Sequence, residues 1–277
     1  MTPSLPGSPP HPRHRPRKRF GQHFLAPSWA AKVVDAIAPR STETVLEIGP
    51  GHGALTRLLA ERADAVTAIE IDRDLVARLR RDAIPRVTIV EADVLSIDLA
   101  SLGLPLGTRV AGNLPYNISS PILFRLIAAQ RRAGLFADAT LMLQKEVVDR
   151  LAAGPGSKDY GLLSIFVALS ARVSRVLTLP PGAFRPAPKV TSAVARLEFL
   201  PARERPVVPA PFEGMVRAMF AARRKTIANG LKAPAQLAGV DVAEALATAG
   251  IAPTARPETL SVDRLLALAR VLEHPPR

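Results

Sequence analysis

The sequence predicts a doubly wound α/β fold followed by a small all-helical domain. From residue 44 to residue 144, short β-branched runs alternate with longer amphipathic stretches, which is typical of a mostly parallel sheet covered by helices. After Pro201 the strand signals stop and amphipathic stretches follow one another. The chain has 277 residues, so one larger domain with a small second one is expected.

The individual elements follow from the same pattern. The strands expected in the parallel part of the sheet are 44–48, 65–71, 87–92, 108–113 and 139–144. Two further strands are expected at 175–179 and 192–200. The proline-rich segment 180–190 between them predicts an antiparallel hairpin at the sheet's edge. The helical stretches expected in the second domain are 211–231, 240–250 and 261–273.

Two changes in composition divide the chain. Residues 1–16 are rich in proline and poor in apolar residues, and we expect a disordered tail there. Residues 17–200 are expected to form the α/β domain, and residues 201–277 the helical domain. No internal repeat is found.

The composition excludes several kinds of chemistry. The chain has no cysteine and five scattered histidines, so disulfides, thiol catalysis and the usual zinc sites lack ligands, and we expect no metal. No run approaches the roughly 18 apolar residues of a membrane span, and the N-terminus lacks the apolar segment of a secretory signal. We therefore expect a cytoplasmic protein with no membrane partner.

Glycines and acids gather at the carboxyl ends of the predicted strands. Gly49 and Gly51 lie in EIGPGHG (47–53), where glycines let a ligand approach the backbone and the N–H groups of the following helix. Glu70 ends the second strand, where an acid can bind two ribose hydroxyls. Asp93 follows the third strand and can accept a hydrogen bond from an adenine amino group. An adenosine without a pyrophosphate therefore fits best, although each acid alone could be a solvated strand end.

The fourth strand ends in GNLPYN (112–117), at the edge where open α/β sheets bind their substrates. The amide oxygen of Asn113 and the carbonyl of Leu114 can accept both N–H bonds of an exocyclic amino group such as adenine N6. The nitrogen then approaches tetrahedral geometry, and its lone pair can be aimed at a sulfonium methyl. Tyr116, after Pro115, would stack on the base, so catalysis would be mainly positioning without a strong base. The structural alternative is a plain turn built from Asn and Pro.

Seven segments occur in the order of a known family, namely RKRFGQHFL, EIGPGHGALT, AIEIDRDL, GNLPYNISSPILF, LMLQKEVVDRLAAGPGSKDYGLLS, PPGAFRPAPKVTSAVARLEF and AARRKTIANGL. From about Arg17 to its C-terminus, the chain resembles the KsgA-type ribosomal RNA adenine dimethyltransferases of bacteria. The resemblance implies a Rossmann-like class I methyltransferase fold. It also implies two methyl transfers to N6 of each of two adjacent adenines, in a hairpin loop near the 3′ end of 16S ribosomal RNA.

The resemblance further implies a cofactor, a partner and the roles of several residues. The cofactor is S-adenosyl-L-methionine, with contacts expected from His23, Leu25, Gly49, Gly51, Glu70, Asp93 and Asn113. His23 stands where the family commonly has asparagine, so its contact would come from the backbone or the imidazole. Phe184 resembles the family's second aromatic at the target base; a hydrophobic plug under the proline-rich turn is the alternative. The expected partner is an immature small ribosomal subunit, bound by a monomer.

A net charge of +13 favours a polyanionic partner over a bland arginine-rich surface. Residues 1–20 hold five of the 37 Lys/Arg and no acid. Two clusters are candidates for phosphate contacts, namely Arg17, Lys18 and Arg19, and Arg223, Arg224 and Lys225. Because N6 is inaccessible inside a duplex, the target base must be turned out of a loop or an end. The glycine-rich segment 154–161 resembles the family's flexible loop near the substrate.

Three other functions are weighed. A nicotinamide oxidoreductase would explain the glycine turn and Glu70, but not NLPY or the basic excess. A related antibiotic-resistance methyltransferase would modify a large-subunit adenine, but NLPY and the 143–161 segment favour the small subunit. A non-catalytic RNA-binding assembly or transcription factor would not need the set Gly49, Glu70, Asp93 and Asn113.

Overall fold

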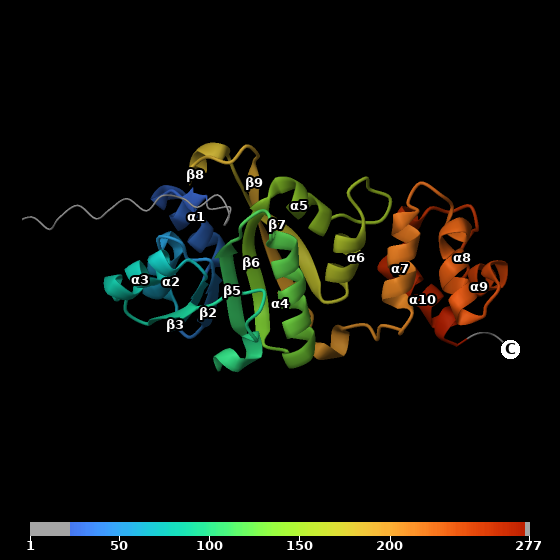
Figure 1. Ribbon diagram of the computed structural model, residues 1–277, viewed down its shortest axis with the longest axis horizontal. Coiled ribbons are helices and arrows are strands. Elements are labelled where there is room, and N and C mark those ends of the chain that lie inside the picture. The colour runs from blue at the N-terminus through green and yellow to red at the C-terminus, as the bar shows by residue number, and fades with distance from the viewer. Residues whose placement is uncertain (1–22, 275–277) are drawn as a thin grey trace, which may run out of the picture.

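The computed structural model describes residues 23–274. Its main sheet has seven strands in the order β4-β3-β2-β5-β6-β9-β7 (Figure 1). Strands β2 to β6 are parallel to one another, and β9 and β7 are antiparallel to their neighbours, which confirms the predicted edge hairpin. The strands are β2 (Thr44–Ile48), β3 (Ala65–Glu70), β4 (Val87–Glu91), β5 (Thr108–Asn113), β6 (Phe136–Gln144), β7 (Ala171–Leu179) and β9 (Ser192–Phe199).

Helices cover both faces of this sheet because its strands are apolar on both sides. Val45 packs in a core with α1 and α2, while its neighbour Leu46 packs in the opposite core with α4 and α5. This alternation is the two-residue period of a strand buried on both faces. The helices of this part are α1 (Pro27–Ile37), α2 (Ala54–Arg62), α3 (Arg73–Asp82), α4 (Ser119–Ala133), α5 (Lys145–Leu151) and α6 (Leu162–Ala168).

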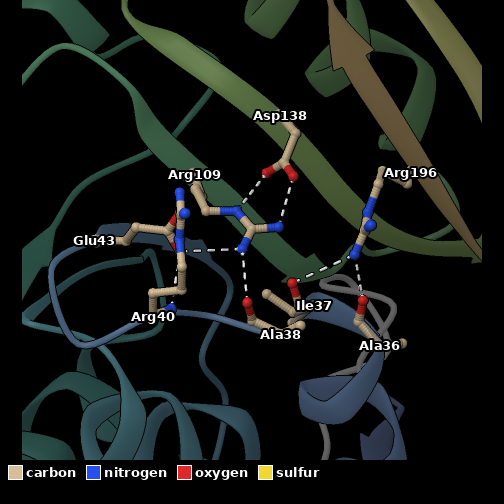
Figure 2. A network of polar contacts seen from close by, with 8 residues as sticks. All are labelled: Ala36, Ile37, Ala38, Arg40, Glu43, Arg109, Asp138 and Arg196. Atoms are coloured by element: carbon tan, nitrogen blue, oxygen red, sulfur yellow. Dashed lines mark hydrogen bonds and ion pairs between the residues drawn. The ribbon is translucent and has the colours of Figure 1, made fainter.

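A network of arginines fixes the C-terminal end of α1 at the amino end of the parallel strands, where β5 begins (Figure 2). Arg109 of β5 is buried and donates to both carboxylate oxygens of Asp138, at 2.9 and 2.6 Å, and to the carbonyl of Ala38 at 3.0 Å. Ala38 ends the helix at φ +50°, a left-handed conformation that costs a non-glycine residue roughly 1–2 kcal/mol. Arg196 of β9 donates to the carbonyls of Ala36 and Ile37. Positive charge at a helix C-terminus is favourable, so α1 is held firmly there.

Four helices follow the sheet and enclose a second core, as expected for the C-terminal part. They are α7 (Phe212–Ala221), α8 (Ile227–Ala238), α9 (Val242–Thr248) and α10 (Val262–Glu273). This core also takes Tyr160, Ile165 and Leu169 from the α5–α6 loop and from α6 and its C-cap. The division of the chain at residue 200 stays a prediction.

The single helical stretch expected at 211–231 is two helices. The chain turns between Ala221 and Ile227, and α8 folds back on α7. A Cβ on Gly230 would come within 3.1 Å of the Met219 Cα, so this close packing of the two helices depends on glycine. The amphipathic period continues across the break, which is why the sequence did not reveal it.

A separate two-stranded sheet was not expected at all. β1 (Phe24–Leu25) pairs antiparallel with β8 (Phe184–Arg185), in the register Phe24 to Arg185 and Leu25 to Phe184. Two-residue strands are too short for an alternating pattern to show. The remaining short elements are the 3-10 helices η2 (Leu99–Leu102), η3 (Pro181–Ala183), η4 (Ala202–Glu204) and η5 (Pro257–Thr259).

Candidate functional site

A cavity of about 730 Å³ opens at the carboxyl ends of the parallel strands. The turns after β2, β3, β4 and β5 line it, together with residues of β1. Ten of the site residues expected from the sequence line this one cavity, namely His23, Leu25, Gly49, Gly51, Glu70, Asp93, Asn113, Leu114, Pro115 and Tyr116. The topology therefore brings together side chains that are as far as 93 positions apart in the sequence.

The glycine turn after β2 forms one wall. Gly49 and Gly51 have φ values of +70° and +59°, in the left-handed region that favours glycine. A Cβ on Gly51 would lie 3.1 Å from the ring of Phe24, so β1 lies directly against this turn. Side chains at these positions would be strained, and at Gly51 would also crowd Phe24.

Glu70 is held in a fixed orientation at the end of β3. One carboxylate oxygen accepts the N–H groups of Ile71 and Asp72, each at 2.9 Å, and the other accepts the N–H of Gly51 at 3.1 Å. Burial raises the pKa of Glu70, although these three hydrogen bonds oppose the rise. A carboxylate oxygen can accept two hydrogen bonds, so the oxygen facing Gly51 has capacity for a ligand hydroxyl.

Asp93 lines the cavity in the turn after β4. Its Oδ1 accepts the N–H of Leu95 at 2.9 Å, which holds the turn after β4. Its other oxygen accepts no hydrogen bond from the described residues, so it can accept one from a ligand amino group.

Glu47 is a buried acid of the cavity that the sequence analysis did not single out. Its side chain is 1 % exposed, and its Oε2 has no hydrogen-bond partner among the described residues. Burial raises its pKa to about 7. The signal was present in the sequence, because an acid inside the apolar strand TVLEI is unusual for a core position. An unpaired buried acceptor is costly, and a polar or positively charged ligand group in the adjoining cavity would satisfy it.

Asn113, the last residue of β5, has a defined amide orientation. Its Nδ2 donates to the carbonyl of His23 at 2.7 Å, so the assigned Oδ1 is left as an acceptor at the cavity. The next residue, Leu114, donates its N–H to the carbonyl of Met142 at 3.1 Å. The carbonyl of Leu114 accepts no hydrogen bond from residues 23–274. The two acceptors expected from the sequence are therefore adjacent and available.

Tyr116 is fixed at its ring and at its hydroxyl. The ring stacks on the imidazole of His23, with centroids 5.5 Å apart and an interplanar angle of 24°. The hydroxyl forms a hydrogen bond with the hydroxyl of Ser192, the first residue of β9. Burial raises the pKa of Tyr116, so the phenol stays protonated at neutral pH. Nδ1 of His23 in turn lies 2.8 Å from the carbonyl of Pro186.

Phe184 does not line the cavity. Its side chain is fully buried and packs in the α1–α2 core, and in β8 it is the register partner of Leu25. Its expected contact with a target base stays a prediction, which would require the ring to leave this core.

The structure describes one of the two predicted basic clusters. Arg17, Lys18 and Arg19 lie outside the described residues, as does segment 1–16. Arg223, Arg224 and Lys225 lie between α7 and α8. Arg223 donates to the carbonyl of Lys158 at 2.7 Å, whereas the side chains of Arg224 and Lys225 are exposed and contact no acid of the described chain.

The loop bonded by Arg223 is anchored to the second core. In this 154–161 loop Tyr160 is buried, and its hydroxyl donates to the carbonyl of Leu260 at 2.9 Å. The N–H of Gly156 donates to the carbonyl of Glu258 at 2.7 Å. Residues of the C-terminal part thus hold the loop at three points. Separately, residues 23–274 contain no helix of the length and apolarity needed to cross a membrane.

Comparison with known proteins gives consistent matches along nearly the whole chain. The profile of the family described as ribosomal RNA adenine dimethylase matches residues 13–274. The ribosomal RNA small subunit methyltransferase A of Bordetella petrii is 49% identical, over 94% of this chain and 96% of its own length. A dimethyladenosine transferase from Plasmodium falciparum superposes with a TM-score of 0.72 at 26% identity, covering 89% of this chain and 96% of that one. The 23S rRNA methyltransferase ErmE superposes with a TM-score of 0.66 at 28% identity, and the match covers 91% of this chain and 100% of that one.

Proposed function

Because this chain belongs to the ribosomal RNA adenine dimethylase family, we propose that it methylates N6 of two adjacent adenines with S-adenosylmethionine as the donor. The chain is a ribosomal RNA adenine dimethyltransferase, and the targets we propose lie in a hairpin loop near the 3′ end of 16S ribosomal RNA. The observation that carries the catalytic assignment is the pair of free acceptors at Asn113 and Leu114 beside the Tyr116 ring.

The cavity suits the proposed cofactor. The carboxylate of Glu70, already oriented by three N–H groups, would accept the ribose hydroxyls, and the free oxygen of Asp93 would accept the adenine amino group. A Cβ built on Gly49 would be 3.9 Å from the carbonyl oxygen of Asn113, in ordinary van der Waals contact, so the glycine turn lies close to the end of β5. The methionine part carries an ammonium group, and Glu47 provides a buried acceptor with no partner. When bound, S-adenosylmethionine supplies an electrophilic methyl group on a sulfonium.

The protein's own contribution to the reaction is to bind and orient the adenine. Asn113 Oδ1 and the Leu114 carbonyl would accept the two N–H bonds of N6 and direct its lone pair into the cavity. Tyr116 would stack on the ring of the base. Placing two reactants in near-attack geometry accounts for a large part of many enzymatic rate enhancements, so no strong general base is required.

We propose that the RNA also contacts Arg223, Arg224, Lys225 and the basic cluster 17–19. A loop base turned out of the RNA would reach the cavity while these cations bind phosphates of the surrounding RNA. The partner we propose is an immature small ribosomal subunit, bound by a monomer in the cytoplasm, with residues 17–200 as the catalytic domain and 201–277 as an RNA-binding domain.

Small-subunit RNA is favoured over large-subunit RNA by the comparisons. The 23S rRNA methyltransferase ErmE shares the fold at 28% identity, whereas the small-subunit enzyme of Bordetella petrii is 49% identical. A nicotinamide enzyme is not supported, because the free acceptors at Asn113 and Leu114 suit an amino nucleophile and have no role in hydride transfer.

The test is methyl transfer from labelled cofactor to small subunits from cells that lack the activity, followed by nucleoside analysis of the RNA. The expected product is N6,N6-dimethyladenosine, located at two adjacent positions. Large subunits from the same cells serve as the control. Label in large-subunit RNA, or none in either particle, would contradict the proposal.

A further inference from the structure

The segment between β8 and β9 is fixed at both ends to the catalytic group. At its start, the carbonyl oxygen of Pro186 lies 2.8 Å from Nδ1 of His23, and the imidazole of His23 stacks on the ring of Tyr116. Ser192, at its end, bonds to the hydroxyl of Tyr116. Figure 1 shows β8 above the main sheet, with the chain running from it down into β9. Residues 186–191, named here the rim turn, therefore lie beside the Tyr116 ring.

The rim turn is stiff as well as anchored. It contains Pro186 and Pro188, whose rings fix φ, and the carbonyl of Thr191 accepts the N–H of Lys145 at 3.0 Å. The backbone that carries a charged side chain on such a turn is already ordered before a ligand binds. Binding through it therefore costs less entropy than binding through a mobile loop.

Two cations on and next to the rim turn have no acidic partner among the described residues. Arg185 and Lys189 are both exposed, and neither forms an ion pair or a side-chain hydrogen bond there. Many other arginines of the α/β part are engaged; Arg109, Arg132 and Arg172, for example, each contact an acid. Two unneutralised charges on a rigid rim are an attractive site for an anion.

We infer that Arg185 and Lys189 bind the RNA phosphates on either side of the adenine that enters the cavity. The inference rests on the proposed function and adds a contact surface to it. A base that leaves the stack and lies on Tyr116 carries its own 5′ and 3′ phosphates to the rim of the cavity. The rim turn is bonded to His23 and continues into Ser192, which is bonded to Tyr116, and both His23 and Tyr116 line the cavity. Its cations would therefore fix the register of the target nucleotide, whereas more distant cations hold the surrounding RNA.

The test compares charge removal with charge retention. In the full-length chain, Arg185→Ala with Lys189→Ala removes two cations, and Arg185→Lys with Lys189→Arg keeps them. The control is Arg131→Ala with Arg203→Ala, two exposed arginines without acidic partners. Arg131 lies in the last turn of α4, and Arg203 lies in η4 just after β9. Both are near the end of the sheet where β6 begins, so they remove the same charge far from the cavity. Affinity for unmethylated small subunits is measured across a salt series, and cofactor affinity confirms that each variant is folded.

Two lost single-strand phosphate contacts predict that the slope of log affinity against log salt falls by about 1.4. This loss is expected for the alanine pair at 185 and 189, and a nearly normal slope for both the charge-retaining pair and the control pair. An unchanged slope in the alanine pair, or an equal loss in the control pair, would overturn the inference. If the unchanged chain does not methylate small subunits, the proposed function itself fails, so the two failures are distinguishable.

Discussion

The hydroxyl groups of Tyr116 and Ser192 bond to each other across the cavity rim, which joins the turn after β5 to the first residue of the antiparallel strand β9. Ser192 is fully buried. The ring of Tyr116 is the part expected to contact a base, and the hydroxyl is the part that fixes the ring.

This division predicts different outcomes for two substitutions. Tyr116→Phe should retain much of the single-turnover rate, because stacking needs the ring, whereas Tyr116→Ala should be slow. Tyr116→Phe should also cost about 1–3 kcal/mol of unfolding free energy, since it leaves the buried Ser192 hydroxyl without its partner. Adding Ser192→Ala should recover part of that loss. An inactive but folded Tyr116→Phe would show that the hydroxyl takes part in the chemistry.

Asn113→Ala should lose most turnover at saturating cofactor. The hydrogen bond from N6 to its Oδ1 strengthens as the nitrogen becomes tetrahedral, so its loss lowers the rate with little change in RNA affinity. The measurement is a single-turnover rate on unmethylated small subunits. Asn229→Ala, the same substitution on the exposed surface of α8, is the control. A near-normal rate for Asn113→Ala would remove the proposed acceptor.

Glu70→Ala should weaken cofactor binding by roughly 1.5 to 3 kcal/mol, which is about ten- to 150-fold, and leave RNA binding nearly unchanged. Glu91→Ala is a matched control. Glu91 is the register partner of Glu70 on β4, but it is exposed and does not line the cavity. Calorimetry with S-adenosylmethionine measures both variants, and equal affinity in the two would exclude Glu70 as a ligand contact.

Replacing Arg223, Arg224 and Lys225 together with alanine should weaken RNA binding and lower its salt slope by about 2. Arg223 bonds to the Lys158 carbonyl and not to an acid, so its charge is not neutralised and each of the three cations should contribute about 0.7. The Arg224 and Lys225 pair alone should therefore account for about 1.4 of the change. Salt series with small subunits give both values. A slope that does not move would identify the cluster as a solvated surface.

Glu47 predicts a pH dependence of stability. Its pKa is raised to about 7 in the folded chain from 4.5, so between these values the folded state binds more protons than the unfolded state. Stability should therefore fall as pH rises from 4.5 to about 7, by at most about 1.4 kcal/mol per pH unit from this group. Glu47→Gln should flatten that part of the profile and be more stable than the unchanged chain at pH 8. Denaturant unfolding at several pH values is the measurement, and parallel profiles would refute the assignment.

Periodicity and strand-end chemistry predicted most of the α/β part. The five parallel strands, the edge hairpin and the gathering of Glu70, Asp93 and Asn113 at one edge are all observed. The strands were predictable because strands buried on both faces leave a strong apolar signal in the sequence. The gathering of the site residues was predictable because a parallel topology places the carboxyl ends of the strands together.

What escaped prediction depends on contacts between distant segments. The pairing of β1 with β8 and the burial of Phe184 come from residues about 160 positions apart, and no local pattern encodes them. After the break between α7 and α8, Gly230 packs against Met219, which is again a contact that no local pattern encodes. Glu47 was passed over because it lay in a strand that was otherwise interpreted as core.

Helix α1 is about 16 Å long and runs from the carboxyl ends of the parallel strands to their amino ends. Its first residues follow the His23 carbonyl that orients Asn113, and the N–H of Ala26 donates to the carbonyl of Ala183 at 2.9 Å. Its last carbonyls are held by Arg109 and Arg196. Substitutions at that far edge would thus be transmitted along the helix to the acceptor amide. Screens that look for harmless stabilising changes should treat this end of the sheet as part of the machinery of catalysis, although its residues do not line the cavity.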